Sequence, residues 1–363
     1  MKKVIFILGT RKASGYYRME MACNLLQEKG FQAESVYYDT LEYLNLTAEI
    51  PTILGKPKLI NLLDYDVIIF QLVWHPFFLH FMDRLKTYNK KLVMEIDDDY
   101  FAIPASNPAW ITFHPKIKVK QDANGERVGI KYKTQVNTKL ITLRNACRKV
   151  DMLQVSTPEL AEIYKPLNKN IVILENMIEN ELYDAIPKRQ NKKPVIGWYG
   201  TGTHEDDLRI VLGCFPQQEK FTLLLAGWGE VSDVLFKGYK NLEVYGRFPM
   251  EDLPKYVKKC DIGIVPLVGC RFNDGKSDLK GMEFGAGEIP VIASDVAPYR
   301  RWIRHNENGL LVKRNKTKFW IRYLKQLIED KDLRERLGKE AKKDAIKRDI
   351  SNNIDKWINT YFL

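Results

Sequence analysis

The sequence predicts an α/β protein with two doubly wound, Rossmann-like domains facing a central cleft. Short, wholly apolar segments alternate with helix-like segments along the 363 residues. Such strands are typical of parallel sheets whose two faces are both covered by helices. The alternation stops once, over a polar and basic stretch, and then restarts. A chain of this length is also too long for one ordinary core, so two domains are expected.

The first domain is expected over residues 1–180. One segment, residues 116–133, breaks its rhythm by alternating basic and apolar side chains on both sides of Asn124-Gly125. Asn-Gly between alternating runs is the strongest short signal for a β-hairpin, so we expect a basic hairpin inserted in this domain. The expected strands are KKVIFILG, FQAESVYY, DVIIFQL, KLVMEID, MLQVST and NIVILEN, and the expected helices are YYRMEMACNLLQEKG and PELAEIYKPL.

A linker is expected over residues 181–194, because the stretch is polar and basic and carries Pro187 and Pro194. The second domain is then expected over residues 195–350, and a last helix over 351–363. The expected strands of the second domain are VIGWYG, FTLLLAG, LEVYG, DIGIVPL, PVIAS and GLLVK, followed by helices over 316–348.

Charge and cysteine content narrow the class of protein. The net charge of +11 is concentrated in residues 101–150 and 301–350, which carry +8 each, so an acidic partner is expected. The five cysteines are scattered, with no C-x-x-C pair, which favours reduced thiols in a cytoplasm without a disulfide framework or a zinc site. The longest apolar region is shorter than a membrane span, and the N-terminus reads as a strand rather than a signal peptide.

The stretch FNDGKSDLKGMEFGAGEIPVIASDVAPYR, residues 272–300, carries the strongest functional signal. It begins after an apolar strand, where the ligands of open parallel sheets bind. A helix that starts there offers unpaired N–H groups to a phosphate. Lys276 and Lys280 are four residues apart and are expected on one face of that helix, and Glu283 would accept both hydroxyls of a ribose. The alternative for the two lysines is an ordinary solvated helix face.

This stretch, together with GWYGTGTHEDDL, resembles the retaining glycosyltransferases of GT-B fold, in particular glycosyltransferase family four. ASGYYRMEMACNLL, KLVMEIDDDYFAIP and VSTPELAEIY agree more loosely. The resemblance implies a nucleotide-sugar donor, UDP- or GDP-linked, in the second domain, an acceptor on the first, and transfer with retention of configuration. It also implies that Glu283 holds the donor ribose, that Lys276 and Lys280 hold the diphosphate, and that the last helix packs on the first domain with Trp357 buried.

The sequence departs from the family at one position. The family places a second glutamate eight residues before the first, where this chain has Gly275, so Asp274 is the expected substitute. In the loop after VIGWYG, His204 is expected to face the donor, and the alternative is that Thr203 and Asp206 form a helix-capping box. The expected donor-binding residues are Glu283, Gly200, Gly202, His204, Asp274, Gly275, Gly281 and Arg247.

The first domain supplies the expected acceptor side. Gly15 and Arg18 follow the first strand, and the alternative for Arg18 is an ordinary surface arginine. Asp97 to Asp99 end another strand, where they position the acceptor, cap a turn or bind a divalent cation. His75 ends a further strand, where a buried core histidine is the rival interpretation. The expected catalytic residues are Lys276, Lys280, Asp97, Asp99 and His75, and the hairpin adds Lys118, Lys120 and Lys131 on the acceptor side.

These features predict a cytoplasmic hexosyltransferase, at most peripheral to the membrane, that acts on an anionic acceptor. A cell-envelope glycan or a glycolipid is the main expectation, and DNA with a hydroxymethylated base is the alternative. No tightly bound cofactor and no metal ligands are expected, with a divalent cation at the aspartates as the other choice. Because Gly275 replaces the family's glutamate, a catalytically silent binding protein of the same fold remains an alternative. A nicotinamide-dependent enzyme is the third, although no G-x-G-x-x-G follows the first strand.

Overall fold

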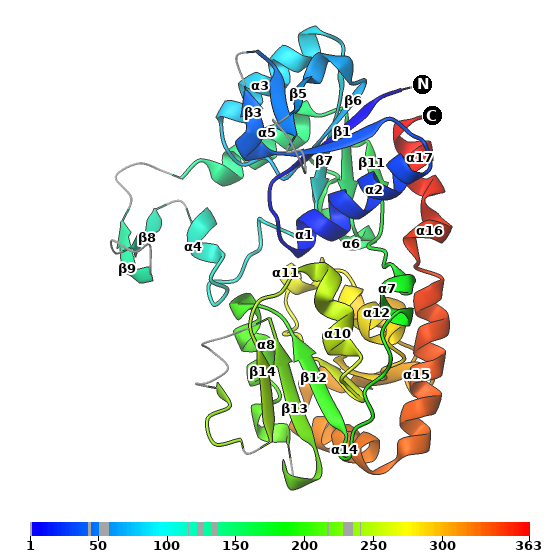
Figure 1. Ribbon diagram of the computed structural model, residues 1–363. Helices are drawn as coiled ribbons and strands as arrows, with labels where there is room; N and C mark the ends of the chain where they lie inside the picture. Colours follow the sequence, from blue (N-terminus) through cyan, green and yellow to red (C-terminus); the bar gives the residue numbers. More distant parts are fainter. Residues whose placement is uncertain are drawn as a thin grey trace. The chain divides into compact units, whose positions relative to one another are not determined.

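The chain forms two compact units in the computed structural model (Figure 1). Unit 1 comprises Met1–Ala105, Ala109–Glu175 and Asn353–Leu363, and unit 2 comprises Ser106–Pro108 and Asn176–Asn352. Each unit contains one six-stranded parallel sheet with helices, which confirms the predicted fold class. The structure describes residues 2–42, 45–50, 58–114, 116–121, 127–132, 137–215, 218–227, 235–239 and 241–363, with the backbone alone at 49, 50, 58, 117–121 and 127–132.

The sheet of unit 1 has the strand order β11-β10-β7-β6-β1-β2. Its central strands are buried along almost their whole length, as expected for wholly apolar strands covered on both faces. Val4 of β1 pairs with Ala33 of β2 on one side and with Val67 of β6 on the other. The strands are β1 Val4–Leu8, β2 Ala33–Tyr37, β6 Val67–Gln71, β7 Lys91–Ile96, β10 Met152–Val155 and β11 Ile171–Ile173.

Local signals place the helices of unit 1. The Thr157 hydroxyl accepts a hydrogen bond from the Leu160 N–H at 3.2 Å, and Pro158 occupies the first position of α6, a combination that favours a helix start. The helices are α1 Ala13–Gly15, the π-helical turn η1 Tyr16–Glu20, α2 Met21–Glu28, α3 Phe77–Thr87, α4 Trp110–Phe113, α5 Lys139–Lys149, α6 Pro158–Tyr164 and α17 Asp355–Tyr361, with 3₁₀ turns at η2 Tyr38–Thr40 and η3 Leu62–Asp64.

The C-terminal helix α17 is part of unit 1. Trp357 is 1% exposed and Tyr361 is fully buried. The Tyr361 hydroxyl donates a hydrogen bond to the side chain of Gln154 in β10, and its ring packs edge-on against Phe6 of β1, with centroids 5.6 Å apart. Residues that follow all of unit 2 in the chain therefore complete the core of unit 1.

Two small antiparallel sheets also belong to unit 1. The first contains β3 Leu41–Glu42, β4 Thr47–Ile50 and β5 Lys58–Asn61, where no strands were expected because the apolar runs are short and mixed. The second is a hairpin of β8 Ile117–Gln121 and β9 Arg127–Tyr132, within the expected segment 116–133. Its register pairs Lys118 with Lys131, whereas the Asn124-Gly125 turn lies outside the described residues.

Unit 2 contains the six strands expected for the second domain, in the order β14-β13-β12-β15-β16-β17. They are β12 Val195–Tyr199, β13 Thr222–Ala226, β14 Leu242–Tyr245, β15 Ile262–Val265, β16 Val291–Ser294 and β17 Gly309–Val312. The helices are α7 Asn180–Asp184, α8 Glu205–Arg209, α10 Leu253–Val257, α11 Arg271–Asp274, α12 Leu279–Ala286, α13 Ala297–Trp302, α14 Thr317–Glu329, α15 Lys331–Ile346 and α16 Ile350–Asn353, with 3₁₀ turns at η4 Gly202–His204, η5 Leu212–Cys214, η6 Gln218–Lys220, η7 Met250–Asp252 and η8 Lys313–Asn315.

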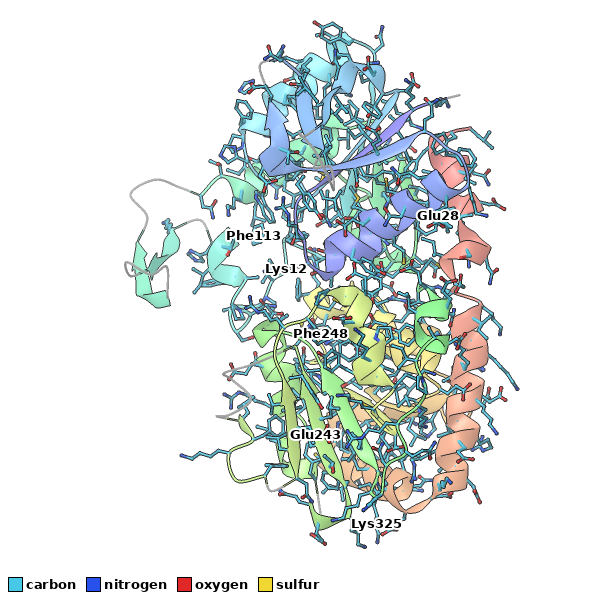
Figure 2. The ribbon with its side chains drawn as sticks, in the orientation of Figure 1. Lys12, Glu28, Phe113, Glu243, Phe248 and Lys325 are labelled. Atoms are coloured by element: carbon cyan, nitrogen blue, oxygen red, sulfur yellow. The ribbon has the colours of Figure 1, made fainter. Side chains whose placement is uncertain are left out.

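The expected linker, residues 181–194, lies within unit 2 and begins inside helix α7. Arg189 makes two hydrogen bonds of 3.0 Å to the carboxylate of Glu243, which is labelled in Figure 2, and its backbone N–H donates to the Lys258 carbonyl. Apart from Ser106–Pro108, the chain enters unit 2 between Glu175 and Asn176 and returns to unit 1 at Asn353.

Candidate functional site

The carboxyl edge of the unit 2 sheet gathers most of the expected donor residues. Tyr199 ends β12 and is followed by Gly200, and β15 leads through α11 to α12 (Figure 1). Because parallel strands end at the same edge of a sheet, the loops after β12, β14 and β15 lie along one edge. This edge is the position where open α/β sheets bind their ligands.

Glu283 is held in place at this edge by a strand residue. Its side chain lies on α12, is 1% exposed, and accepts a hydrogen bond from the hydroxyl of Tyr199. The same hydroxyl lies 3.3 Å from the carbonyl oxygen of Lys280. Tyr199 was not among the expected site residues, because a tyrosine in an apolar strand is usually a residue of the hydrophobic core. Its hydroxyl fixes the direction of the Glu283 carboxylate.

The ammonium group of Lys280 is half-buried and has no carboxylate within ion-pair distance in the described part of the chain. It lies over the rings of Trp198 and Tyr199, 5.2 and 5.7 Å from their centroids. A Cβ on Gly200 would lie 2.8 Å from the Trp198 indole and 3.1 Å from Nζ, so the glycine leaves room for both side chains. Burial lowers the pKa of Lys280 to about 8, against the opposing attraction of Asp207 and Glu283.

His204 is fixed by a carboxylate that was not expected in the site. Its Nδ1 lies 2.8 Å from Oδ2 of Asp207, and Oδ1 of Asp207 accepts the Val268 N–H at 2.7 Å. Asp207 is 5% exposed and so connects α8 to the loop after β15 from within the unit. Burial and the neighbouring charge of Lys280 lower the pKa of His204 to about 4, so the imidazole is neutral at pH 7. His204 precedes α8 without capping it, and the alternative capping box is not formed.

Lys276 does not share a helix with Lys280, which corrects the sequence-based expectation. Helix α11 ends at Asp274, Lys276 lies in the connecting turn, and α12 begins at Leu279. The turn is stabilised by Arg301, whose guanidinium donates to the Lys276 carbonyl at 2.5 Å. The Lys276 ammonium lies 4.3 Å from the centroid of the Phe272 ring.

Gly281 packs against an aromatic side chain of the interior, so the absence of a side chain there has a packing cause. A Cβ there would lie 3.0 Å from the ring of Trp302 on α13. Gly285 contacts the same indole, with a Cβ at 2.8 Å. The glycines of α12 thus allow the indole of Trp302 to approach the helix.

The remaining expected donor residues lie in the loops of unit 2. Gly275 is buried at the end of α11, and Asp274 beside it is exposed. Gly202 opens the η4 turn that contains His204. Arg247 is exposed in the segment after β14, next to Phe248, which Figure 2 labels.

At the carboxyl edge of the unit 1 sheet, His75 and Asp97 are accessible and Asp99 is not. His75 is exposed just before α3, so the rival interpretation of a core histidine is wrong. Asp97 accepts a hydrogen bond from the Tyr100 hydroxyl at 2.8 Å. Asp99 is fully buried and accepts the Phe101 N–H at 3.2 Å, which gives it a structural role in the turn after β7. It stabilises a tight turn, as short acidic side chains commonly do.

Arg18 is an internal residue, so its alternative interpretation as an ordinary surface arginine is wrong. It is 2% exposed, and its Nε donates to the buried carboxylate of Glu95 at 2.7 Å. A second guanidinium nitrogen donates to the Leu174 carbonyl at 2.6 Å. A buried guanidinium requires such partners, and these two hold Arg18 within the interior of unit 1. Burial raises the pKa of Glu95, and Arg18 opposes this change.

Gly15 has a clear structural cause. A Cβ at this position would overlap the Thr10 carbonyl oxygen. The glycine therefore lets the loop after β1 close against α1, and it is buried.

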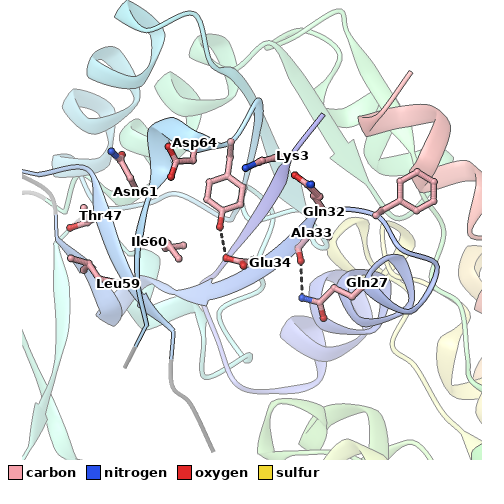
Figure 3. A pocket seen from close by; sticks show the side chains of 12 residues that line it. Lys3, Gln27, Gln32, Ala33, Glu34, Thr47, Leu59, Ile60, Asn61 and Asp64 are labelled. Carbon is pink, nitrogen blue, oxygen red and sulfur yellow. Dashed lines mark hydrogen bonds between the residues drawn. The ribbon is translucent and has the colours of Figure 1, made fainter. Parts of the chain in front are cut away.

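The hairpin lysines Lys118, Lys120 and Lys131 lie on β8 and β9, and their side chains are outside the described part of the structure. A surface pocket of about 640 Å³ lies elsewhere in unit 1, near the starts of β1 and β2 (Figure 3). Lys3, Gln32 and Asp64 are among its polar lining residues, and none of the expected site residues lines it. Across the described ranges, no three His, Cys, Asp or Glu side chains gather as a metal site requires. No described helix is both long and apolar enough to span a bilayer.

Comparisons with known proteins bear on the family of unit 2 and on the fold of the chain. Residues 179–344, most of unit 2, match the family model described as glycosyl transferases group 1. A segment of 110 residues is 28% identical to "Putative glycosyltransferase EpsD" of Bacillus subtilis (strain 168). That match covers 30% of this chain, and the chain spans only 28% of the length of the Bacillus protein.

Solved structures extend the likeness to the whole chain at the level of fold. A sucrose-phosphate synthase from Thermosynechococcus elongatus superposes with a TM-score of 0.67 at 13% identity, covering 100% of this chain and 98% of that chain. Anabaena HepE, in a structure that contains UDP and glucose, gives 0.62 at 13% identity, covering 100% and 99%. A glycosyltransferase from Rickettsia africae gives 0.65 at 13% identity, covering 99% and 97%. The fold is that of the GT-B glycosyltransferases.

Proposed function

We propose that this protein is a glycosyltransferase that moves a sugar from a UDP- or GDP-sugar to an anionic acceptor in the cytoplasm. The observation that carries the proposal is the pair of charged groups on α12. Lys280 has a half-buried ammonium without a carboxylate partner in the described residues, and Glu283 has a buried carboxylate oriented by Tyr199. The group 1 match over residues 179–344 includes both.

Lys280 binds and stabilises the diphosphate in this proposal. Sugar transfer leaves a nucleoside diphosphate, on which negative charge develops as the glycosidic bond to phosphate breaks. A preorganised ammonium group in a partly desolvated site stabilises such charge more than water does. Lys276 and the exposed Arg247 supply further positive charge from neighbouring loops. No step of this scheme requires a metal ion.

Glu283 fixes the nucleoside. A carboxylate offers two oxygens that accept hydrogen bonds, which suits the two hydroxyls of a ribose. The Tyr199 hydroxyl occupies part of this accepting capacity and sets the orientation of the rest. We further propose that the transfer retains the anomeric configuration. Proton NMR of the product from a donor of known anomer tests this, and an inverted product would refute it.

The acceptor is proposed to bind unit 1, where residues 101–150 carry a net charge of +8. His75 and Asp97 lie at the carboxyl edge of that sheet and would contact the acceptor hydroxyl. A cell-envelope glycan or an anionic glycolipid fits this charge, and glycolipid transfer would involve peripheral contact with the membrane. Replacing Lys118, Lys120 and Lys131 by Gln should weaken acceptor binding and its salt dependence while donor hydrolysis is unchanged. DNA that carries a hydroxymethylated base is the alternative acceptor, and it is tested in the same way with the wild type and the Gln variant.

Thermal unfolding with UDP, GDP, ADP and their sugar conjugates tests the donor site. A ligand at a hundred times its dissociation constant adds about 2.7 kcal/mol, a shift of several degrees. One nucleotide family should stabilise the wild type, and Lys280→Ala and Glu283→Ala should each abolish the shift. Lys325→Ala is the matched control, because Lys325 is exposed on α14 (Figure 2) and should leave the shift intact. Stabilisation by no nucleotide would refute the proposal.

Gly275 favours a second candidate, a nucleotide-binding protein of this fold that does not catalyse transfer. The resemblance places a sugar-contacting glutamate there, and Gly275 is buried without a side chain. A donor that binds but is neither hydrolysed nor transferred, with either class of acceptor, would favour this candidate over the enzyme.

A further inference from the structure

The proton of His204 is assigned by its partner. Oδ1 of Asp207 accepts the Val268 N–H at 2.7 Å, and Oδ2 lies 2.8 Å from Nδ1 of His204. A carboxylate can only accept, so Nδ1 must be the donor. A neutral imidazole carries a single N–H, which leaves Nε2 of His204 with a lone pair and no proton.

Three other histidines show the opposite arrangement. Nδ1 accepts a backbone N–H in His305, at 3.0 Å, in His114, at 3.1 Å, and in His75, at 3.4 Å. In their neutral forms the proton is therefore on Nε2. His204 thus has the reverse tautomer, and Asp207 imposes it.

The lone pair of His204 is accessible to a ligand. The side chain is 20% exposed, while the Asp207 side chain that holds Nδ1 is only 7% exposed. Nε2 has no hydrogen-bond partner among the described residues. It is not a buried atom, so it reaches solvent. Lys280 and Lys276 are close enough to disfavour a positive charge on the ring.

An acceptor atom in this position selects its ligand. Beside a phosphate oxygen, the lone pair of Nε2 would meet a second acceptor, which is repulsive. Beside a hydroxyl, Nε2 accepts a hydrogen bond. A nucleotide sugar carries hydroxyls on its ribose and on the sugar to be transferred, on either side of the diphosphate. Lys280, on the same edge, has the complementary preference for phosphate. Lys280 is thus suited to the phosphate oxygens of a nucleotide sugar, and Nε2 of His204 to its hydroxyl groups.

We propose that Nε2 of His204 accepts a hydrogen bond from a hydroxyl of the nucleotide-sugar donor, and that Asp207 positions His204 by fixing the tautomer that permits it. The inference rests on the proposed function and adds a specificity-determining residue to it. His204 then recognises a hydroxyl group of the nucleotide sugar and does not bind phosphate.

Nitrogen NMR of the full chain labelled with ¹⁵N-histidine tests the tautomer without any ligand. Near pH 7, His204 should show a protonated Nδ1 and an unprotonated Nε2, and His305 should show the reverse as an internal control. His204→Gln identifies the signal by its loss. Asp207→Asn should exchange the two states, because Val268 keeps the amide oxygen and the NH₂ group then donates to Nδ1. A protonated Nε2 in the wild type would overturn the proposal.

Donor binding tests the hydroxyl contact. With the nucleotide sugar that stabilises the wild type, His204→Leu should weaken binding about three- to tenfold, the range of one neutral hydrogen bond. His204→Gln, whose amide oxygen can accept, should restore most of it. A merely structural role predicts no such rescue. A deoxy nucleotide sugar that lacks the contacted hydroxyl should bind the wild type and His204→Leu with the same affinity. Asp207→Asn, which puts a proton on Nε2, should tighten the binding of inorganic pyrophosphate, because Nε2 can then donate to a phosphate oxygen.

Inorganic pyrophosphate separates the outcomes. Its affinity should be unchanged in His204→Leu, and an equal loss for pyrophosphate and nucleotide sugar would show a phosphate contact and overturn the inference alone. Equal binding of the nucleotide sugar by wild type and His204→Leu would also overturn it alone. If the wild type bound no nucleotide, the proposed function would fail first and the inference with it.

Discussion

Lys280 and His204 are neighbouring residues whose pKa values are both lowered, mainly by burial. The consequences differ because the groups differ. The histidine is neutral above a pH of about 4, and its Nε2 is then a hydrogen-bond acceptor, whereas the lysine keeps its charge up to a pH of about 8. The half-buried ammonium therefore lowers the stability of the free protein in exchange for anion binding, a common compromise at binding sites.

Replacing Lys280 by Met should stabilise the free protein and remove donor binding. The lysine pKa of about 8 lies below its unfolded value of 10.5, so the unfolded chain binds more protons between these values. Wild-type stability should therefore rise from pH 8 to 10.5, and the Lys280→Met curve should lack this rise and lie higher below pH 8. Thermal unfolding across this pH range measures it, with Lys325→Met as the control that should resemble wild type.

Donor affinity should fall as the pH rises above about 8, because the ammonium that faces the diphosphate is lost. The other charged groups around Lys280 are Asp207, Glu283 and Lys276. Calorimetric titration of the donor between pH 7 and 9.5 checks this, and in Lys280→Arg the affinity should be flat, because a guanidinium does not deprotonate there.

Tyr199→Phe should weaken donor binding about tenfold and destabilise unit 2 by about 1–3 kcal/mol, because it removes a donor from a buried carboxylate. Tyr239→Phe is the matched control, since its hydroxyl donates to the Leu212 carbonyl at 2.9 Å in the same unit. It should cost less stability and leave donor binding unchanged. Urea unfolding and donor titration give both quantities, and equal binding by Tyr199→Phe and wild type would contradict the role of Tyr199.

Residues of the site were predictable from sequence where the signal was local. Glu283 and Lys280 stand next to an apolar strand, and that position alone places them at the sheet edge. Asp207 follows His204 by three residues, but its second partner, Val268, is 61 residues further on, so no local pattern marks it. Arg18 was misjudged for the same reason, because its partner Glu95 is 77 residues away.

Helix α12 presents Lys280 and Glu283 because it is held on its other sides. Trp302 packs against Gly281 and Gly285, and Lys342 of α15 donates to the Ala286 carbonyl at 3.1 Å, near the end of the helix. The break between α11 and α12 was missed, although Ser277-Asp278 before an apolar run is a common helix-start signal. Strands were predicted well because wholly apolar runs leave few alternatives, whereas the short β3, β4 and β5 contain no such run.

Gly285→Ala should destabilise unit 2 by about 1–3 kcal/mol, the usual cost of overpacking. The new Cβ would lie 2.8 Å from the Trp302 ring and 3.0 Å from the Ala341 carbonyl oxygen. In an open helix the same change stabilises by about 1 kcal/mol. Gly213→Ala in η5 is the control, because no atom lies within 4 Å of its new Cβ. Denaturant unfolding of both variants measures the difference, and a stabilised Gly285→Ala would contradict the packing.

On the scale of the whole molecule, the two units differ in connectivity. Unit 2 is continuous apart from Ser106–Pro108, whereas unit 1 is assembled from segments that flank unit 2 in the chain. The sequence indicated two alternating halves, but only the resemblance assigned the last helix to the first one. Its partners Phe6 and Gln154 lie far away in sequence and leave no periodic signal.

Trp357→Ala should destabilise unit 1 by about 3–5 kcal/mol, the cost of removing a buried indole. Hydrogen exchange of the full chain should accelerate in peptides of β1, β10 and α17. Peptides of β12 and β16 should keep their protection, and the donor should still stabilise unit 2. Uniform loss of protection in both units would contradict their separate cores.

The position of α17 in the chain also has a consequence for synthesis on the ribosome. Translation proceeds from the N-terminus, so β1 and β10 leave the ribosome before any of α12, and Trp357 and Tyr361 follow after all of unit 2. Until they arrive, the faces of Phe6 and Gln154 that they cover are exposed in the nascent chain. Unit 2 can meanwhile fold as soon as its own residues emerge. The core of unit 1 can therefore be completed only after the whole of unit 2 has been synthesised.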